Sequence, residues 1–219
     1  MGIKSRCTCW RNKTAIKGIG SEELKYAIFG DIHSSIEDLD QVLEHIEHIS
    51  PEAKLIGTGD LFECTISKKD ITDKKFTELN QVMLNPDGFE TRLTFPSVKG
   101  NQEERIIQIT ETNNPLREKL VELPGTIMIE NAQVIHGHQW KWGGEPWSLI
   151  AAEVNDPLVF YGHSHTSILT IDGNQQKIVW DHPYDVNGEQ VMVNVGAVVG
   201  EREWVLYEAD KKTVTFYKA

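Results

Sequence analysis

The residues of this chain that are best suited to chemistry are seven potential metal ligands spread over most of its length. Each is an aspartate, an asparagine or a histidine, and each group follows an apolar run rich in β-branched residues. In order along the chain they are Asp31, His33, Asp60, Asn101, His136, His163 and His165. Such a run predicts a buried strand, and open α/β sheets place their ligands in the loops that follow such strands. We therefore expect the seven side chains to converge at the ends of strands.

These residue types suit a pair of divalent metal ions that acts on phosphate. Carboxylates hold the positive charge, and imidazoles set the geometry around transition metals. Two ions about 3.5–4 Å apart need one shared carboxylate, and Asp60 is the candidate because it lies between the first ligands and the later ones. Two divalent ions against only Asp31 and Asp60 leave a site of about +2, which would attract phosphate. A water bound to the ions could ionise at about pH 7 and attack phosphorus in line.

Composition limits the class of protein. The chain has 219 residues, 39% hydrophobic and 25% charged, which suits one soluble domain. No apolar stretch approaches the roughly 18 residues needed to cross a bilayer, and no secretory signal is recognisable. The net charge of -11 argues against a broad nucleic-acid-binding surface. Three cysteines make a poor disulfide framework, so we expect a reducing, cytoplasmic location.

The hydrophobic pattern predicts one α/β domain over residues 25–219, with βα units first and mostly hairpins later. Tyr26–Phe29 and Lys54–Thr58 read as parallel strands around a helix that Ser34 and Glu37 begin as a capping box. Further helices are expected at about 68–84, 103–110, 116–121 and 147–154, and further strands at 95–99, 126–129, 133–135, 158–161, 168–171, 177–180, 191–194, 204–207 and 213–217. Residues 1–24 show neither helix nor strand periodicity and are expected to form an N-terminal extension.

The order of these motifs resembles that of the calcineurin-like metallophosphoesterase superfamily: Asp-x-His, Gly-Asp, Gly-Asn, His and Gly-His-x-His. Three segments, Val134–Gln139, Gly162–His165 and Val193–Val198, are similar to its small YfcE-like phosphodiesterase branch. The resemblance runs from about Lys25 to the C-terminus. It implies an α/β fold, a four-layer α-β-β-α sandwich with two mixed β-sheets, and a small phosphoester as the substrate.

The same resemblance assigns the ligands. The first metal ion would take Asp31, His33, Asp60 and His165, and the second would take Asp60, Asn101, His136 and His163. Two divalent transition-metal ions are implied, with manganese the usual choice and nickel or iron the alternatives.

Two positions depart from the superfamily pattern. Gln102 stands where a histidine commonly protonates the leaving oxygen, and Ala197 stands where serine is usual. A lost general acid typically costs about 10²–10⁴-fold, which predicts slower turnover or a preference for good leaving groups. His138 is the candidate catalytic residue on the ligand turn, where it could support a ligand or contact substrate; a structural contact is the alternative.

We therefore expect a phosphodiesterase that uses a metal-bridging hydroxide. One alternative is a phosphoprotein or nucleoside-polyphosphate phosphatase, although Glu63-Cys64-Thr65 replaces the Asp-Arg-Gly usual in those enzymes. Another is a non-catalytic scaffold on the same fold, although scaffolding relatives tend to lose ligands and all seven are present here. Neither a membrane nor nucleic acid is an expected partner.

Overall fold

The computed structural model describes residues 23–73, 75–139 and 157–219. Nearly all of the expected N-terminal extension, and the helix expected at 147–154, lie outside these residues. Within them, no helix is both long enough and apolar enough to span a membrane.

The first sheet has five strands and contains the predicted βαβ unit. β1 and β2 are parallel, with α1 between them in sequence, whereas the other pairs are antiparallel. In spatial order the strands are β10 (Pro183–Asp185), β13 (Thr213–Lys218), β12 (Glu203–Glu208), β1 (Lys25–Phe29) and β2 (Lys54–Gly57), and α1 spans Ile36–Ile49.

The second sheet has six strands and is also mixed. β6, β7 and β11 run parallel to one another, and the outer strands pair antiparallel. In spatial order the strands are β5 (Thr126–Ile129), β6 (Ala132–Ile135), β7 (Leu158–Tyr161), β11 (Val191–Val195), β8 (Ser167–Ile171) and β9 (Asn174–Gln176).

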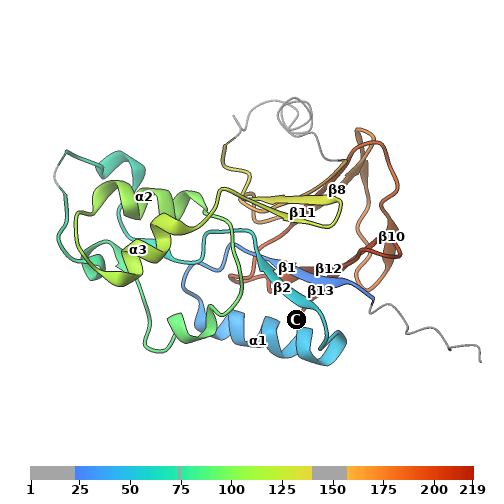
Figure 1. Ribbon diagram of the computed structural model, residues 1–219, viewed down its shortest axis with the longest axis horizontal. Helices are drawn as coiled ribbons and strands as arrows, with labels where there is room; N and C mark the ends of the chain where they lie inside the picture. Colours follow the sequence, from blue (N-terminus) through green and yellow to red (C-terminus); the bar gives the residue numbers. More distant parts are fainter. Residues whose placement is uncertain (1–22, 74, 140–156) are drawn as a thin grey trace, which may run out of the picture.

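The alternation of side chains along β1 explains how the layers stack. Tyr26 and Ile28 are buried in the apolar cluster shared with the second sheet, whereas Ala27 and Phe29 are buried in the cluster that contains α1, because successive side chains of a strand point to opposite faces. Figure 1 shows α1 beneath the first sheet and the second sheet above it. The mixed α/β fold with two mixed sheets is thereby confirmed.

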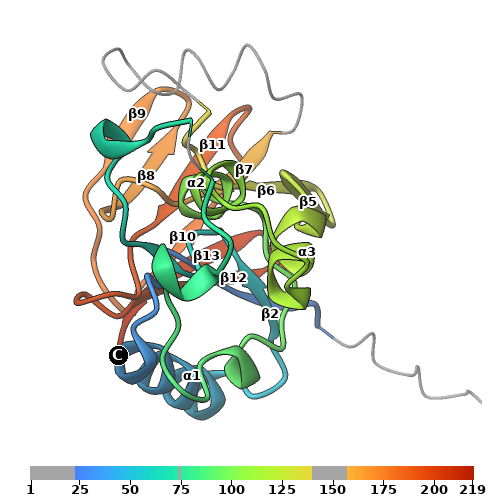
Figure 2. The ribbon, with the colours of Figure 1, turned by 90° about the vertical axis from the view of Figure 1, so that its left-hand side faces the viewer.

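Two further helices flank the sheets. α2 (Asn101–Ile109) and α3 (Pro115–Glu122) pack together on one side of both sheets, and Figure 2 views the molecule from that side. The helices predicted at 103–110 and 116–121 are confirmed, with α2 beginning two residues earlier. This start puts Asn101 at the N-terminus of α2.

The helix predicted at 68–84 is wrong. This segment holds two 3₁₀ turns, η1 (Lys68–Asp70) and η2 (Leu79–Gln81), and then β4 (Met83–Leu84), which pairs with β3 (Glu63–Cys64); a third turn, η3, spans Glu90–Arg92. The backbone of Phe76 bonds instead to Ile109, the last residue of α2, and to Glu111 just beyond it. Pairing with distant backbone thus outweighs the helical spacing of the apolar residues.

The strands predicted at 95–99 and 177–180 are also wrong. Ser97 forms only an isolated bridge to Gly57, because the neighbouring Pro96 has no N–H for a ladder. At 177–180 the hydroxyl of Tyr184 donates to the carbonyl of Lys177 and accepts from the N–H of Val179, in place of a neighbouring strand.

The predicted capping box of α1 is absent. The N-cap is Ser35, whose hydroxyl donates to Asp38, while Ser34 donates to the carbonyl of Leu84.

Candidate metal centre

The seven predicted ligands come from loops at one end of the two sheets. Asp31 and His33 follow β1, Asp60 follows β2, and Asn101 begins α2. On the second sheet, His136 follows β6 directly, and His163 and His165 follow β7. The structure brings six of these seven side chains together in two compact groups. The first group is Asp31, His33 and His165, and the second group is Asp60, His136 and His163; within each group one ligand atom per residue lies within 4.8 Å of the others.

Asp60 joins the two groups. Its Oδ1 accepts a hydrogen bond from the backbone N–H of Gln102 at 2.8 Å. Its Oδ2 is left facing both groups, 3.3 Å from Nε2 of His136 and 3.7 Å from Nε2 of His33. One carboxylate between two sets of imidazoles is the arrangement that a shared ligand of two ions requires.

Asp31 supplies a direct test of whether a cation fits. Its Oδ2 accepts a hydrogen bond from the backbone N–H of His163 at 2.9 Å, which ties the two groups together. Its Oδ1 is buried and has no hydrogen-bond partner among the described residues, and it lies 3.4 Å from Nε2 of His165. A buried carboxylate oxygen without a partner is costly. A cation held with His33 and His165 would satisfy it.

His136 is oriented by the backbone of the β2 loop. Its Nδ1 lies 2.8 Å from the carbonyl oxygen of Thr58, so Nδ1 must carry a proton and donate it. Nε2 therefore faces Asp60 and Asn101, whose Oδ1 is 3.1 Å away. In the absence of a cation, burial opposes protonation, but the hydrogen bond and charge of Asp60 raise the pKa of His136 to about 9. A metal ion would take the place of that proton.

His163, in the same group as His136, has a pKa shifted in the opposite direction. Burial, together with the neighbouring His136, lowers the pKa of His163 to about 4. The ring is therefore neutral at physiological pH and can offer a nitrogen lone pair to a cation.

The backbone is strained where the ligands sit. Five of the seven have a positive φ, a conformation that is rare for residues other than glycine: Asp31 (50°), His33 (48°), Asp60 (50°), His163 (71°) and His165 (56°). Such outliers cluster at functional sites because the surrounding structure must hold them in place.

Two glycines allow the loops to approach the carboxylates. A Cβ on Gly162 would lie 2.4 Å from Oδ2 of Asp31, and a Cβ on Gly100 would lie 2.1 Å from Oδ1 of Asp60. Any side chain at either position would displace a candidate ligand.

Two glutamates that were not predicted as site residues support the ligands. The fully buried Glu103 accepts hydrogen bonds from the backbone N–H groups of Asp60, Phe62 and Gly100; burial and the charge of Asp60 raise the pKa of Glu103 to about 7. Glu63 lies 2.5 Å from Nδ1 of His33. The position of Glu63, three residues after Asp60 in the same loop, is the signal that could have indicated it.

The remaining positions singled out in the sequence have distinct surroundings. Gln102 is buried, and its Oε1 accepts the N–H of Cys64 at 3.2 Å, so its side chain braces β3. His138 belongs to neither group, but its ring lies 5.2 Å from that of His136 and its Nε2 lies 3.0 Å from Glu104. It therefore borders the second group without joining it.

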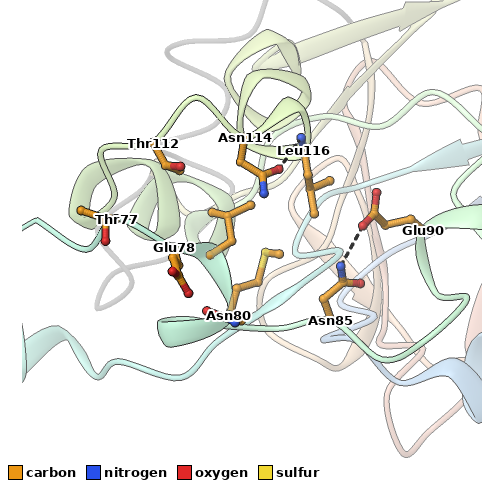
Figure 3. A pocket seen from close by; sticks show the side chains of 10 residues that line it. Thr77, Glu78, Asn80, Asn85, Glu90, Thr112, Asn114 and Leu116 are labelled. Atoms are coloured by element: carbon orange, nitrogen blue, oxygen red, sulfur yellow. Dashed lines mark hydrogen bonds between the residues drawn. The ribbon is translucent and has the colours of Figure 1, made fainter.

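A separate cavity of about 390 Å³ lies beside β4 and the start of α3 (Figure 3). Its lining is rich in amides and hydroxyls, among them Asn80, Asn85 and Asn114, and Glu78 and Glu90 are the charged residues among the described ones that line it. None of its lining residues is a predicted ligand, and its negative charge does not suit a phosphate.

Residues 24–211 match the family model of the calcineurin-like phosphoesterase superfamily domain. No curated protein matches the chain.

Several solved structures have a similar fold. A metallophosphoesterase from Sphaerobacter thermophilus is 18% identical, covers 90% of this chain and 88% of its own, and has a TM-score of 0.66. A putative diadenosine tetraphosphatase is 16% identical, with 90% and 95% covered and a TM-score of 0.52. YfcE, a phosphoesterase from E. coli, is 17% identical, with 85% and 90% covered and a TM-score of 0.45. At these identities the likeness concerns the fold alone.

Proposed function

Because the chain belongs to the calcineurin-like phosphoesterase superfamily, we propose that it is a dinuclear metal-dependent phosphoesterase that favours phosphodiesters. The observation that carries the proposal is the pair of ligand groups joined by Asp60, beside a buried oxygen of Asp31 that has no hydrogen-bond partner among the described residues.

Each ion has a candidate set of ligands in this chain. Asp31, His33 and His165 would hold one ion, and Asn101, His136 and His163 would hold the other, with Asp60 shared. When bound, two divalent ions, manganese or alternatively nickel or iron, supply positive charge for the phosphate and lower the pKa of a bound water. The protein contributes the strained loops and buried hydrogen bonds that hold the ligands before substrate arrives.

The preference for diesters rests on position 102, where the superfamily pattern has a histidine that protonates the leaving oxygen. Gln102 has no acidic proton and its side-chain oxygen is engaged with Cys64. Alkoxide leaving groups need protonation more than phenolate-like ones do. The enzyme should therefore act best on activated diesters. A small phosphoester as the substrate and a cytoplasmic location are part of the same proposal.

The alternatives predict different substrates. The fold shared with a putative diadenosine tetraphosphatase supports adding dinucleoside polyphosphates to a substrate panel. A non-catalytic scaffold would have no need for seven ligands or for strain at five of them.

The test is hydrolysis by the full-length chain loaded with Mn²⁺. Bis-p-nitrophenyl phosphate, p-nitrophenyl phosphate and diadenosine tetraphosphate would be compared, with Asp60→Ala and His163→Ala as inactive variants. His48→Ala is the matched control, since His48 is an exposed histidine of α1. We expect diester hydrolysis that is lost in both site variants and kept in the control. A Mn²⁺-loaded protein that hydrolyses none of the three esters would contradict the proposal.

A further inference from the structure

Two candidate metal ligands, His136 and His33, are held at Nδ1 by different kinds of group. Nδ1 of His136 donates to a neutral backbone carbonyl, that of Thr58, at 2.8 Å. Nδ1 of His33 faces a carboxylate oxygen of Glu63 at 2.5 Å. The first group thus has an extra negative charge directly behind one of its ligands.

Glu63 is fixed by its own backbone. It is the first residue of β3 and pairs with Leu84 of β4. Its N–H donates to the hydroxyl of Ser34 at 3.0 Å, and the same hydroxyl donates to the carbonyl of Leu84 at 2.6 Å. The hairpin therefore fastens Glu63 to the loop that carries His33. Its side chain remains 38% exposed, whereas that of His33 is 11% exposed.

We propose that Glu63 is a positioning residue that strengthens binding of one metal ion, the ion at the first group. This inference rests on the proposed dinuclear site. The carboxylate keeps the proton of His33 on Nδ1, so that Nε2 presents a lone pair toward Asp31 and Asp60. It also makes the ring a stronger donor to a cation. Without Glu63, the ring could carry its proton on Nε2 and point it into the site.

The effect should be confined to one of the two ions. His136 depends on Thr58, and among the described residues Glu63 contacts His33 but no member of the second group. Loss of a carboxylate behind a metal-bound histidine typically costs about 10–100-fold in affinity. Glu63→Gln removes the charge and keeps an acceptor, whereas Glu63→Ala removes both, so the alanine variant should bind more weakly.

The experiment is calorimetric titration of the full-length protein with Mn²⁺ after chelation. Glu52→Gln is the matched control, because it removes the same charge and breaks an ion pair with Lys25 far from the site. We expect one of two binding steps to weaken about 10–100-fold in Glu63→Ala, less in Glu63→Gln, and neither step to change in Glu52→Gln. Nitrogen NMR of the histidine rings before metal addition should report an Nδ1–H form of His33 that is lost in Glu63→Ala.

Failure of this inference can be told apart from failure of the proposed function. Equal Mn²⁺ affinities in Glu63→Ala and Glu52→Gln would overturn the role of Glu63, even if the wild type hydrolyses esters. A wild type that binds two Mn²⁺ ions and hydrolyses nothing would instead contradict the proposed function. The Mn²⁺ affinities of the Glu63 variants would still decide the role of Glu63. If Glu63→Ala does not fold, an unchanged Mn²⁺ affinity in Glu63→Gln would overturn the inference.

Discussion

The carboxylate of Glu103 accepts the backbone N–H of Asp60 at 3.0 Å, so one acidic residue at the start of α2 fixes another that joins the two ligand groups. The same carboxylate accepts two more N–H groups, from Phe62 and Gly100. The β2 loop and the N-terminus of α2 are thereby held together behind the metal centre.

Glu103→Ala should destabilise the protein strongly. It would leave three buried N–H groups without a partner, and each costs about 1–3 kcal/mol, so we expect a loss of at least about 3 kcal/mol in the free energy of unfolding. Urea unfolding would measure it. Gln108→Ala, at an exposed position of the same helix, should change stability by less than about 0.5 kcal/mol. Equal unfolding midpoints for the two variants would contradict this account of Glu103.

Gly100→Ala should damage the metal centre, because its Cβ would lie 2.1 Å from Oδ1 of Asp60. Gly125 has nothing within 4 Å of its Cβ position and is the matched control. We expect Gly100→Ala to weaken Mn²⁺ binding at least about tenfold, in the range found when support for a metal ligand is lost, and Gly125→Ala to bind as the wild type does. Dialysis against Mn²⁺ would measure both. Wild-type affinity in Gly100→Ala would show that the loop can move aside.

Stability should depend on pH through Asp38, near the start of α1. Burial raises its pKa, but hydrogen bonds from Ser35, Gly200 and Arg202 outweigh burial and hold the pKa of Asp38 below its usual value. Since the pKa is lower in the folded state, the stabilisation is full above the unfolded pKa of about 4 and is lost as pH falls through the folded value. Asp38→Asn should therefore lower the Tm by about 2–4 °C at pH 7 and by less near pH 3.

Thermal melts at the two pH values would test this expectation. Glu37→Gln, an exposed acid in the same helical turn, should shift the Tm less at pH 7. A shift for Asp38→Asn that grows toward pH 3 would have the wrong sign.

His138→Asn should separate metal binding from turnover. The ring borders the second group and is paired with Glu104, yet it belongs to neither ligand group. We expect two Mn²⁺ ions to bind as before. We expect kcat on bis-p-nitrophenyl phosphate to fall by about 10-fold or more, since loss of a group that assists proton transfer slows turnover. Unchanged kcat would make His138 a structural contact, and loss of an ion would make it a ligand.

The sequence could predict which side chains gather at the strand ends because their signal is local. A buried strand followed by a polar ligand pair, as at Phe29 to His33, reads directly from the chain, and parallel strands bring such loops to one edge. The supporting residues carry a weaker signal, because nearness to Asp60 in the sequence does not say which side chain Glu63 contacts. Glu63 reaches His33 only because β3 pairs with β4, and Glu103 reaches Asp60 only because α2 packs against the β2 loop.

The elements that were predicted wrongly also depend on contacts between residues far apart in the sequence. Phe76 and Leu79 have helical spacing, but the segment forms backbone hydrogen bonds with the end of α2 and the residues after it, and pairs with β3. Ser34 looks like a helix cap, but its hydroxyl is used by β3 and β4. Long-range pairing decided these positions, and spacing within a short window does not encode it.

The central claim is that two adjacent cations share Asp60, and counting Mn²⁺ ions tests it most directly. Equilibrium dialysis and electron paramagnetic resonance of the wild type should give two bound Mn²⁺ ions per chain that are magnetically coupled, and Asp60→Asn should bind no more than one, uncoupled. A wild type that binds a single Mn²⁺ ion, or an Asp60→Asn variant that keeps the coupled pair, would contradict it.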